Sequence, residues 1–352
     1  MMEPIIKAIR ETALAAFAAR PESVEPVMGG ANNLVFRVTF GGRNILAKAY
    51  FQHPGDRRDR LGAEFGMLEF LWKNGLRCIP EPLFADHERH IGLYQFIEGC
   101  RPRPEEIAWP DVDQLVHLLA EMWRLRKHAG AAALPSGSDS SFSMAGFLDN
   151  VEGRFRHVAN ALAAESVPGE VHEFIQRELL PTLEAVRKFM KQGARNSGLD
   201  LEVCLSLDQR TLNPADHGFH NALRGHDGRL TFLDFEYAGW DDPAQMICNA
   251  CLQPAVPIPA SMQRRFVEVV LGRLGNPAVL AARLRLLYPL FGLKWSLIML
   301  NEFLPVSRER RSFAGDRPED PDRRDEQLGK SKRQVKAVQA YLAAPVFFDC
   351  LV

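Results

Sequence analysis

The sequence predicts an α+β fold in which a small β-rich lobe is followed by a larger, mainly helical lobe. Apolar and polar residues alternate over residues 34–40, Gly41 and Gly42 mark a turn, and residues 44–50 resume an extended pattern, which indicates a hairpin. Beyond residue 99 the pattern changes to long stretches with apolar residues at helical spacing. With 352 residues, of which 46% are hydrophobic, the chain is long enough to bury a core of this kind.

The first lobe is completed by two helices and a further strand. Residues 1–21 predict an amphipathic helix rather than an export signal, because charged residues interrupt the short apolar run. Residues 57–74 have apolar side chains at helical spacing, and Gly75 stands where that helix would end. A strand is expected over residues 91–97.

The second lobe is expected to contain five long helical segments and one short hairpin. The apolar segment 284–304 includes Lys294 and Asn301, so a buried core helix is favoured over a membrane span. Asp227-Gly228 supplies the turn of a short hairpin over residues 221–235. The other helices are expected over residues 112–128, 144–164, 171–192 and 259–275.

Composition narrows the range of partners and compartments. A formal net charge of -1 gives no overall electrostatic reason to expect nucleic acid or an anionic membrane as a partner. Six cysteines without an export signal indicate reduced thiols and a cytoplasmic protein. No obligate protein partner is evident from the sequence. Cys248 and Cys251 form one CxxC inside an apolar helical pattern, which favours core cysteines over a zinc or redox site.

Residues 307–333 are rich in charge and proline, and are expected to form an exposed, solvated loop leading into a last helix.

Three polar residues in residues 212–243 carry the chemistry. Asp216 and Asn221 are five positions apart, and Asp234 ends the strand that follows. Phosphoryl transfer depends on aligning the attacking hydroxyl and on neutralising the charge of the transferred group. Asp216 can orient or deprotonate a hydroxyl, and the oxygens of Asn221 and Asp234 are ligands of the kind that Mg²⁺ prefers.

The sequence here resembles the aminoglycoside phosphotransferase and choline kinase group, which are relatives of protein kinases. In this group the catalytic loop reads H-x-D-x-x-x-x-N and a metal-binding Asp follows on the next hairpin, and Asp216, Asn221 and Asp234 match those positions. The stretch FLDFEYAGWDDP, which ends with Asp242 and Pro243, is similar to a second pattern of the group. The resemblance covers most of the chain. It implies a protein-kinase-like two-lobed fold, with an N-lobe over 1–93, a connector over 94–99 and a C-lobe over 100–352.

The resemblance also implies a site for ATP. The segment that begins at Gly29 is like the loop over the nucleotide phosphates, and Lys48 matches the lysine that contacts those phosphates, with Glu64 as its ion-pair partner. Backbone groups of the connector are expected to bind the adenine. The residues assigned to the nucleotide are Gly29, Gly30, Asn32, Asn33, Lys48, Glu64, Gln95, Phe96 and Ile97.

The chain departs from the group's pattern in the catalytic loop. Pro214 stands where the group has His, so the hydrogen bond that would steady the loop must come from elsewhere. Met246 replaces a later Asp. His220 fits a loop position where the group often has His. His217 is expected to be structural or substrate-facing, and a transition-metal role for the pair is disfavoured.

The resemblance therefore implies a kinase that transfers the γ-phosphate of ATP, with Mg²⁺, to a hydroxyl of a small molecule such as an amino alcohol, a sugar or an aminoglycoside. The alternative is a nucleotide-binding pseudokinase that acts as an interaction module. A protein kinase is a third possibility, although the chain lacks a recognisable D-F-G and A-P-E pair. Fold does not fix the acceptor. Candidates for its pocket are Glu236, Trp240, Asp241 and residues 142–154.

Overall fold

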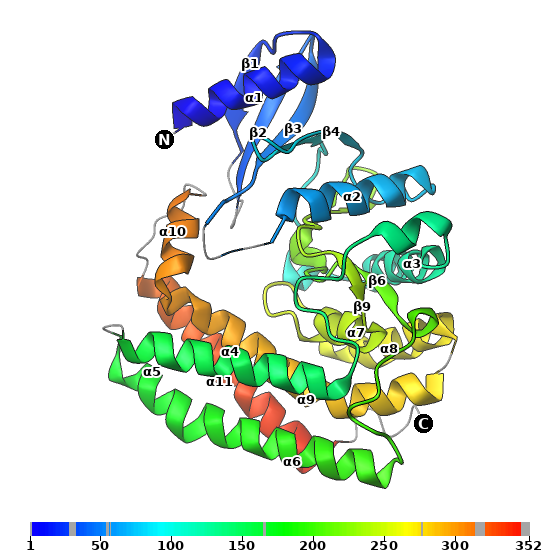
Figure 1. The fold of residues 1–352 in the computed structure, drawn as a ribbon, viewed down its shortest axis with the longest axis vertical. Helices are drawn as coiled ribbons and strands as arrows, with labels where there is room; N and C mark the ends of the chain where they lie inside the picture. Colours follow the sequence, from blue (N-terminus) through cyan, green and yellow to red (C-terminus); the bar gives the residue numbers. More distant parts are fainter. Residues whose placement is uncertain are drawn as a thin grey trace.

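The computed structural model of the protein describes residues 2–27, 33–53, 56, 58–164, 167–275, 277–313 and 321–345. Three residues assigned to the phosphate loop, Gly29, Gly30 and Asn32, lie outside the described residues. Figure 1 shows an antiparallel sheet with one helix lying along it, above a larger body of helices. This arrangement agrees with the α+β architecture that the sequence predicts.

The smaller lobe is a five-stranded antiparallel sheet in the order β1-β2-β3-β5-β4. The predicted hairpin is formed by β2 and β3, and its turn residues Gly41 and Gly42 have positive φ angles of 52° and 79°, which glycine adopts without strain. Alternate side chains of β2 are buried, and Phe36 forms a core with Ile9 of helix α1. The elements are α1 (Met2–Phe17), β1 (Ser23–Pro26), β2 (Leu34–Phe40), β3 (Arg43–Ala49), β4 (Pro82–Asp86) and β5 (Ile91–Gln95).

Helix α2 (Arg60–Lys73) connects the sheet to the larger lobe. It begins where the Asp59 carboxylate accepts the backbone N–H of Gly62 at 2.8 Å, and the chain leaves it through Gly75, whose φ is 91°. Besides its apolar residues, the helix buries two charged ones, Arg60 and Glu64. Because buried charges need partners, these two residues anchor the site described below.

The larger lobe is built around α9 (Pro277–Leu300), a helix with apolar residues on all sides, as predicted for residues 284–304. It packs against α4, α6, α7, α8 and α11. All of these helices are labelled in the larger lobe in Figure 1. Both Cys248 and Cys251 are buried free thiols in α7, as the apolar pattern predicted. The surrounding helices are α3 (Trp109–Leu125), α4 (Met144–Ala164), α5 (Gly169–Phe174), α6 (Leu180–Asn196), α7 (Pro243–Leu252), α8 (Ala260–Leu274) and α11 (Pro321–Ala343).

Two short pairs of antiparallel strands hold the segment that carries the motif. The strands β6 (Thr211–Asn213) and β9 (Gly239–Asp241) pair with each other, as do β7 (Ala222–Arg224) and β8 (Leu230–Phe232). The loop between β6 and β7 contains Asp216, and the segment between β8 and β9 contains Asp234. Both loops therefore start and end on paired strands.

Two expectations from the sequence need correction. The charged segment 307–333 is not a loop leading into a helix, since α10 (Pro305–Phe313) covers its start and α11 covers its end. The helix expected over residues 171–192 is interrupted by one π-helical turn, Ile175–Leu179, between α5 and α6. Among the described residues, none of the helices has both the length and the apolar character needed to cross a membrane.

The central position of α9 leads to a stability prediction. Phe291 of α9 has no exposed surface, and its ring meets that of Phe147 in α4 edge-on, with 5.0 Å between the ring centroids. Substituting Phe291→Ala should lower the free energy of unfolding in urea by about 3–5 kcal/mol, because it leaves a cavity. The control Val203→Ala, at a 58% exposed residue, should change it by less than about 0.5 kcal/mol. Equal effects of the two substitutions would contradict the prediction.

Candidate active site

The loop that carries Asp216 is held by side chains on both sides of it. Ala215 has a φ of 68°, a strained conformation for a residue other than glycine. Its N–H donates to Asn213 Oδ1 at 3.0 Å, and its carbonyl accepts Asn249 Nδ2 at 2.9 Å. Asn213 Nδ2 in turn donates to Asp241 Oδ2 at 2.7 Å. These amides supply the steadying hydrogen bonds that Pro214 cannot.

The Asp216 carboxylate is oriented by a histidine of its own loop. Its Oδ1 lies 3.1 Å from His220 Nε2, and its carbonyl accepts Asn221 Nδ2 at 2.8 Å. His220 Nδ1 is buried with no hydrogen-bond partner in the described part of the chain, so the proton belongs on Nε2. Burial acts to raise the pKa of Asp216, but the hydrogen bond from His220 and the nearby imidazoles lower it below its usual value. Asp216 is therefore an ionised acceptor at neutral pH.

The second histidine of the loop is structural. His217 Nε2 lies 2.9 Å from the carbonyl oxygen of Met246, at the start of α7. Burial lowers the pKa of His217 to about 4, so the ring is neutral. Within the described ranges, no group of three or more His, Cys, Asp or Glu side chains is arranged to hold a metal ion.

A buried lysine joins the sheet to the motif. Lys48 Nζ on β3 donates to Glu64 Oε2 at 2.7 Å and to Asp234 Oδ1 at 2.6 Å. Glu64 is fixed in turn, because it also accepts the Tyr50 hydroxyl at 2.7 Å. Burial acts to lower the pKa of Lys48, but the neighbouring carboxylates hold it well above its ordinary value. The residues predicted to pair, Lys48 and Glu64, are thus in contact, and Asp234 shares the same ammonium group.

Asp234 and Asn221 fit a magnesium ion. Asp234 has a φ of 65°, and its burial raises the pKa of its carboxyl to about 7, with the attraction of Lys48 offset by the charges of Glu236 and Glu64. Asn221 is tied to the same segment, since its carbonyl accepts the N–H of Leu233 at 2.7 Å. Because its Nδ2 donates to the backbone carbonyl of Asp216, its Oδ1 is the atom that would bind a metal ion. An excess of carboxylates beside an amide oxygen is a donor set suited to Mg²⁺.

The connector begins at the end of β5. The N–H of Gln95 donates to the carbonyl of Glu81 at 2.8 Å, so this group is used within the smaller lobe. The ring of Phe96 packs under the Arg37 guanidinium at 4.9 Å. Adenine binding by Gln95, Phe96 and Ile97, and the lobe boundaries at 93/94 and 99/100, stay predictions.

Sequence reasoning missed a buried clamp between the two lobes. Arg60 Nη1 donates to Glu236 Oε1 at 3.0 Å, and Asn33 Nδ2 donates to Glu236 Oε2 at 2.7 Å. Asn33 Oδ1 accepts the N–H of Phe51 at 3.1 Å, so this residue, assigned to the nucleotide, makes internal contacts in the structure. Each of these residues is an ordinary charged or polar position in sequence, and no local pattern pairs residues so far apart.

The candidates for an acceptor pocket are mostly used elsewhere. Glu236 belongs to the clamp, Trp240 Nε1 donates to the carbonyl of Ala131 at 2.9 Å, and Asp241 accepts Asn213 with no exposed surface of its own. None of the three lines the cavity beside Asp216. Of residues 142–154, Arg154 alone lines it.

That cavity has a volume of about 280 Å³. Its wall combines Asp216 and Asn249 with residues from α4, α9 and α10, among them Arg154, Lys294 and Arg310. Ser138 and Asp139 form another side, and their segment is joined to β9 by backbone contacts. Gly137 N donates to Trp240 O at 2.9 Å, and a Cβ on Gly239 would lie only 2.4 Å from Gly137 N, so only glycine fits there.

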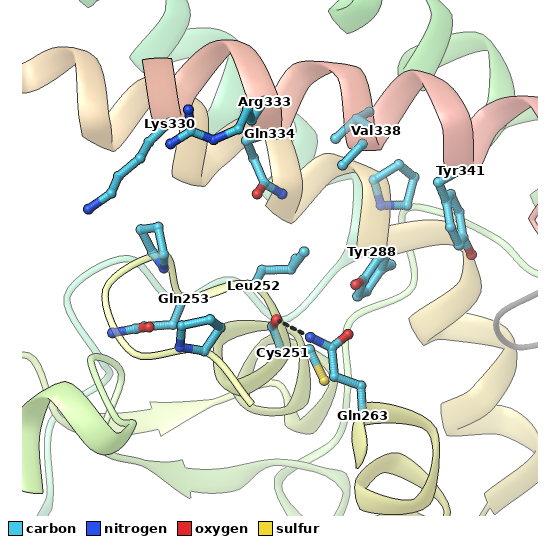
Figure 2. Close-up of a pocket in the computed structure, with 14 residues that line it drawn as sticks. Cys251, Leu252, Gln253, Gln263, Tyr288, Lys330, Arg333, Gln334, Val338 and Tyr341 are labelled. Atoms are coloured by element: carbon cyan, nitrogen blue, oxygen red, sulfur yellow. Dashed lines mark hydrogen bonds between the residues drawn. The ribbon is translucent and has the colours of Figure 1, made fainter. Parts of the chain in front are cut away.

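A larger cavity of about 550 Å³ lies elsewhere in the larger lobe. Figure 2 shows it between α11, which carries Lys330, Gln334 and Tyr341, and the chain around Cys251 and Gln253. None of Asp216, Asn221 and Asp234 lines it. Of these three residues, Asp216 lines the smaller cavity.

A sheet lobe with a buried Lys–Glu pair, above a helical lobe that presents Asp, Asn and Asp in kinase order, defines a kinase-like phosphotransferase. The model of the phosphotransferase enzyme family matches residues 23–252, and the chain belongs to that family. The predicted resemblance, the two-lobed fold and the class of enzyme, an ATP-dependent small-molecule kinase, are thereby confirmed. No curated protein sequence matches the chain.

Solved structures share the fold across their whole length at low identity. A choline/ethanolamine kinase family protein from Mesorhizobium loti is 18% identical with a TM-score of 0.59, and the match covers 98% of this chain and 99% of that one. Choline kinase LicA from Streptococcus pneumoniae is 16% identical with a TM-score of 0.60, covering 95% and 100%. A spectinomycin phosphotransferase, APH(9)-Ia, in complex with ADP and spectinomycin, is 12% identical with a TM-score of 0.58, covering 95% and 97%. At these identities the likeness shows the fold.

The hydrogen bond to Asp216 leads to a pH prediction. Because His220 stabilises the ionised carboxylate, His220→Leu should raise the pKa of Asp216, and the loss of kcat on acidification should begin at higher pH, by about one unit. His220→Gln keeps an N–H donor at a similar reach and should shift the profile less. The measurement is kcat for phosphotransfer against pH in the three proteins. Superimposable acid limbs would rule out this role for His220.

The clamp leads to a stability prediction. Arg60→Met removes the guanidinium group that is hydrogen-bonded to the buried carboxylate of Glu236, and should lower the free energy of unfolding by about 3–5 kcal/mol. The double variant Arg60→Met/Glu236→Gln removes the uncompensated charge and should recover part of that loss. Denaturant unfolding of the parent, the single and the double variant provides the measurement. No recovery in the double variant would mean that Arg60 acts through packing alone.

Proposed function

We propose that this protein transfers the γ-phosphate of ATP to a hydroxyl of a small molecule with Asp216 as the catalytic carboxylate, Lys48 on the nucleotide phosphates, and Asn221 with Asp234 holding Mg²⁺. One observation carries the proposal. The network of Lys48, Glu64 and Asp234 is connected through the backbone pair of Leu233 and Asn221 to a loop that presents an ionised Asp216 to a cavity. The residues proposed to bind the nucleotide and the residue proposed to orient the acceptor hydroxyl are thus joined by one set of hydrogen bonds.

Each residue has a separate task in the proposed reaction. Lys48 neutralises charge on the α- and β-phosphates, and Glu64 fixes its direction. Bound Mg²⁺ would neutralise charge on the phosphates as it builds up on the leaving group. Asp216 accepts the hydrogen bond of the acceptor hydroxyl and aims its oxygen at the γ-phosphorus. Since the transition state of phosphoryl transfer is loose, this orienting role comes first and the proton is taken late.

Two finer points belong to the same proposal. Structures with the same fold include choline kinases and a spectinomycin phosphotransferase, so amino alcohols and antibiotics are reasonable first acceptors to test. We also infer that the protein works in the cytoplasm, because Cys78, Cys100, Cys204, Cys248 and Cys251 are free thiols, which a reducing compartment preserves.

The test is Mg²⁺-dependent release of ADP from ATP across amino alcohols, sugars, aminoglycosides and their acidic derivatives. Asp216→Ala should lower acceptor-stimulated turnover by roughly 10²–10⁴-fold while leaving the affinity for Mg·ATP within a few-fold of the parent. Full turnover in Asp216→Ala would refute its assigned role. Tight nucleotide binding without turnover on any acceptor would favour the pseudokinase alternative, and no nucleotide binding would refute the proposal as a whole.

A further inference from the structure

The cavity beside Asp216 is unusually cationic. Four positively charged side chains line it, together with two carboxylates, Asp139 and Asp216, which leaves a net charge of +2 on the wall. Three of the cations come from helices of the larger lobe, and the fourth comes from the chain just before α2. The four cations are Arg58, Arg154, Lys294 and Arg310.

The pairing of these side chains leaves positive charge uncompensated. Asp139 Oδ2 is shared by two cations, Arg154 Nη2 at 2.9 Å and Lys294 Nζ at 3.5 Å. Burial acts to raise the pKa of Asp139, but Lys294 and Arg154 lower it, so one full negative charge faces two positive ones. Arg58 is paired with Asp56 at 2.6 Å, outside the lining. Arg310 makes no ion pair with any described residue, and its Nε is buried without a hydrogen-bond partner among them.

Unsatisfied polar atoms gather on the same wall. Buried side-chain atoms nearly always have a partner, so those without one indicate where a ligand binds. Four lining residues each have one such atom when partners are sought among the described residues. Two are acceptors, Gln245 Oε1 and Asn249 Oδ1, and two are donors, Trp295 Nε1 and Arg310 Nε. The two hydrogen-bond acceptor atoms can bind hydroxyl groups of a ligand. The two donor atoms are buried beside uncompensated cations, and this combination can bind an oxyanion.

We propose that the acceptor is a hydroxylated small molecule that carries an oxyanion, either a carboxylate or a phosphate ester. Its reacting hydroxyl faces Asp216, and its oxyanion is bound by Arg310 with Lys294 and Arg154. This inference rests on the proposed kinase function and names its class of acceptor. Guanidinium groups bind carboxylate and phosphate through two parallel hydrogen bonds, which provides both affinity and orientation.

In the reaction the hydroxyl oxygen forms a bond to the γ-phosphorus while the bond from that phosphorus to the β–γ bridging oxygen breaks. ADP leaves with the electron pair of the broken bond. The hydroxyl proton passes to Asp216 and then to solvent. The product is a phosphate ester that keeps the original oxyanion.

A cationic acceptor such as an amino alcohol fits this cavity poorly. Its recognition would need free carboxylates or an open aromatic face. Asp139 is already shared by two cations, and the Tyr237 ring faces the guanidinium groups of Arg58 and Arg60 at 5.2 and 5.4 Å. An ammonium group would therefore meet like charge.

The cations are also placed away from the residues assigned to the nucleotide. Lys48, Asn221 and Asp234 do not line the cavity, whereas Arg154, Lys294 and Arg310 lie on α4, α9 and α10 beyond Asp216. If these cations served the γ-phosphate instead, their loss would weaken ATP binding. That possibility makes the Michaelis constant for ATP a required measurement.

The test uses two sets of acceptors matched in carbon skeleton and different in charge. The first set is glycerol, glycerate, glycerol 3-phosphate and 3-amino-1,2-propanediol, and the second is glucose, glucuronate, glucose 6-phosphate and glucosamine. Binding is measured by titration calorimetry with and without Mg²⁺ and a non-hydrolysable ATP analogue, and turnover by ADP release. We expect an anionic member to bind at least tenfold more tightly than its neutral and cationic counterparts. The carboxylate and phosphate arms then identify the oxyanion.

The matched variants are Arg310→Gln and Arg177→Gln, the latter at a 78% exposed side chain outside the cavity. Arg310→Gln should weaken binding of the anionic compound, and lower its kcat/KM, by roughly tenfold or more, with an unchanged Michaelis constant for ATP. Arg177→Gln should change neither. Thermal unfolding of both variants checks that they are folded, and Lys294→Gln provides a second cavity variant.

Each result bears on the inference separately from the proposed kinase function. Turnover with preference for neutral or cationic acceptors, or a raised Michaelis constant for ATP in Arg310→Gln, overturns the anionic acceptor and leaves the kinase intact. Binding that does not depend on the negative charge, including no binding by any compound, also overturns it. Arg310-dependent binding of an anion without phosphate transfer supports the anion site and counts against the proposed kinase function.

Discussion

The site depends on one buried lysine whose single positive charge is shared by more carboxylates than it can neutralise. Lys48 is hydrogen-bonded to Glu64 and Asp234, and Glu236 lies close enough to raise its pKa further. One ammonium cannot neutralise three carboxylates in a buried setting, and the other cation of the network, Arg60, is needed to hold Glu236. The result ties β3, α2 and the segment after β8 together, and leaves residual negative charge where a divalent cation would be most stabilised.

The opposite imbalance exists on the other side of Asp216. Around the cavity the cations outnumber the carboxylates, and Arg310 has no carboxylate partner in the described part of the chain. Asp216 thus lies between a region rich in negative charge, suited to a metal, and a region rich in positive charge, suited to an oxyanion. Such separation would keep the proposed anionic acceptor away from Asp234 and Glu236, which would repel it.

The sequence predicted what is encoded locally. The hairpin at Gly41-Gly42, the helix ending at Gly75, the central apolar helix and the spacing of Asp216, Asn221 and Asp234 each depend on residues close together in the chain. The pairs that hold the site, Arg60 with Glu236 and Asn213 with Asp241, join residues 176 and 28 positions apart, and no periodicity marks them. Helix α10 was missed for another reason. Its charged composition resembles that of a solvated loop, and Arg310 reaches the cavity only because the fold brings α10 to the wall that residues of α4 and α9 also form.

The contact between Gly137 and Gly239 has a consequence for the entropy of the reaction. Next to it, the backbone that leads to Asp139 is hydrogen-bonded to β9, and β9 pairs with β6, from which the loop that carries Asp216 starts. One wall of the cavity and the Asp216 carboxylate are therefore held by one set of covalent and hydrogen bonds. In the proposed reaction, an acceptor bound against that wall would already be positioned relative to Asp216, so little motional freedom would remain to be lost on the way to the transition state.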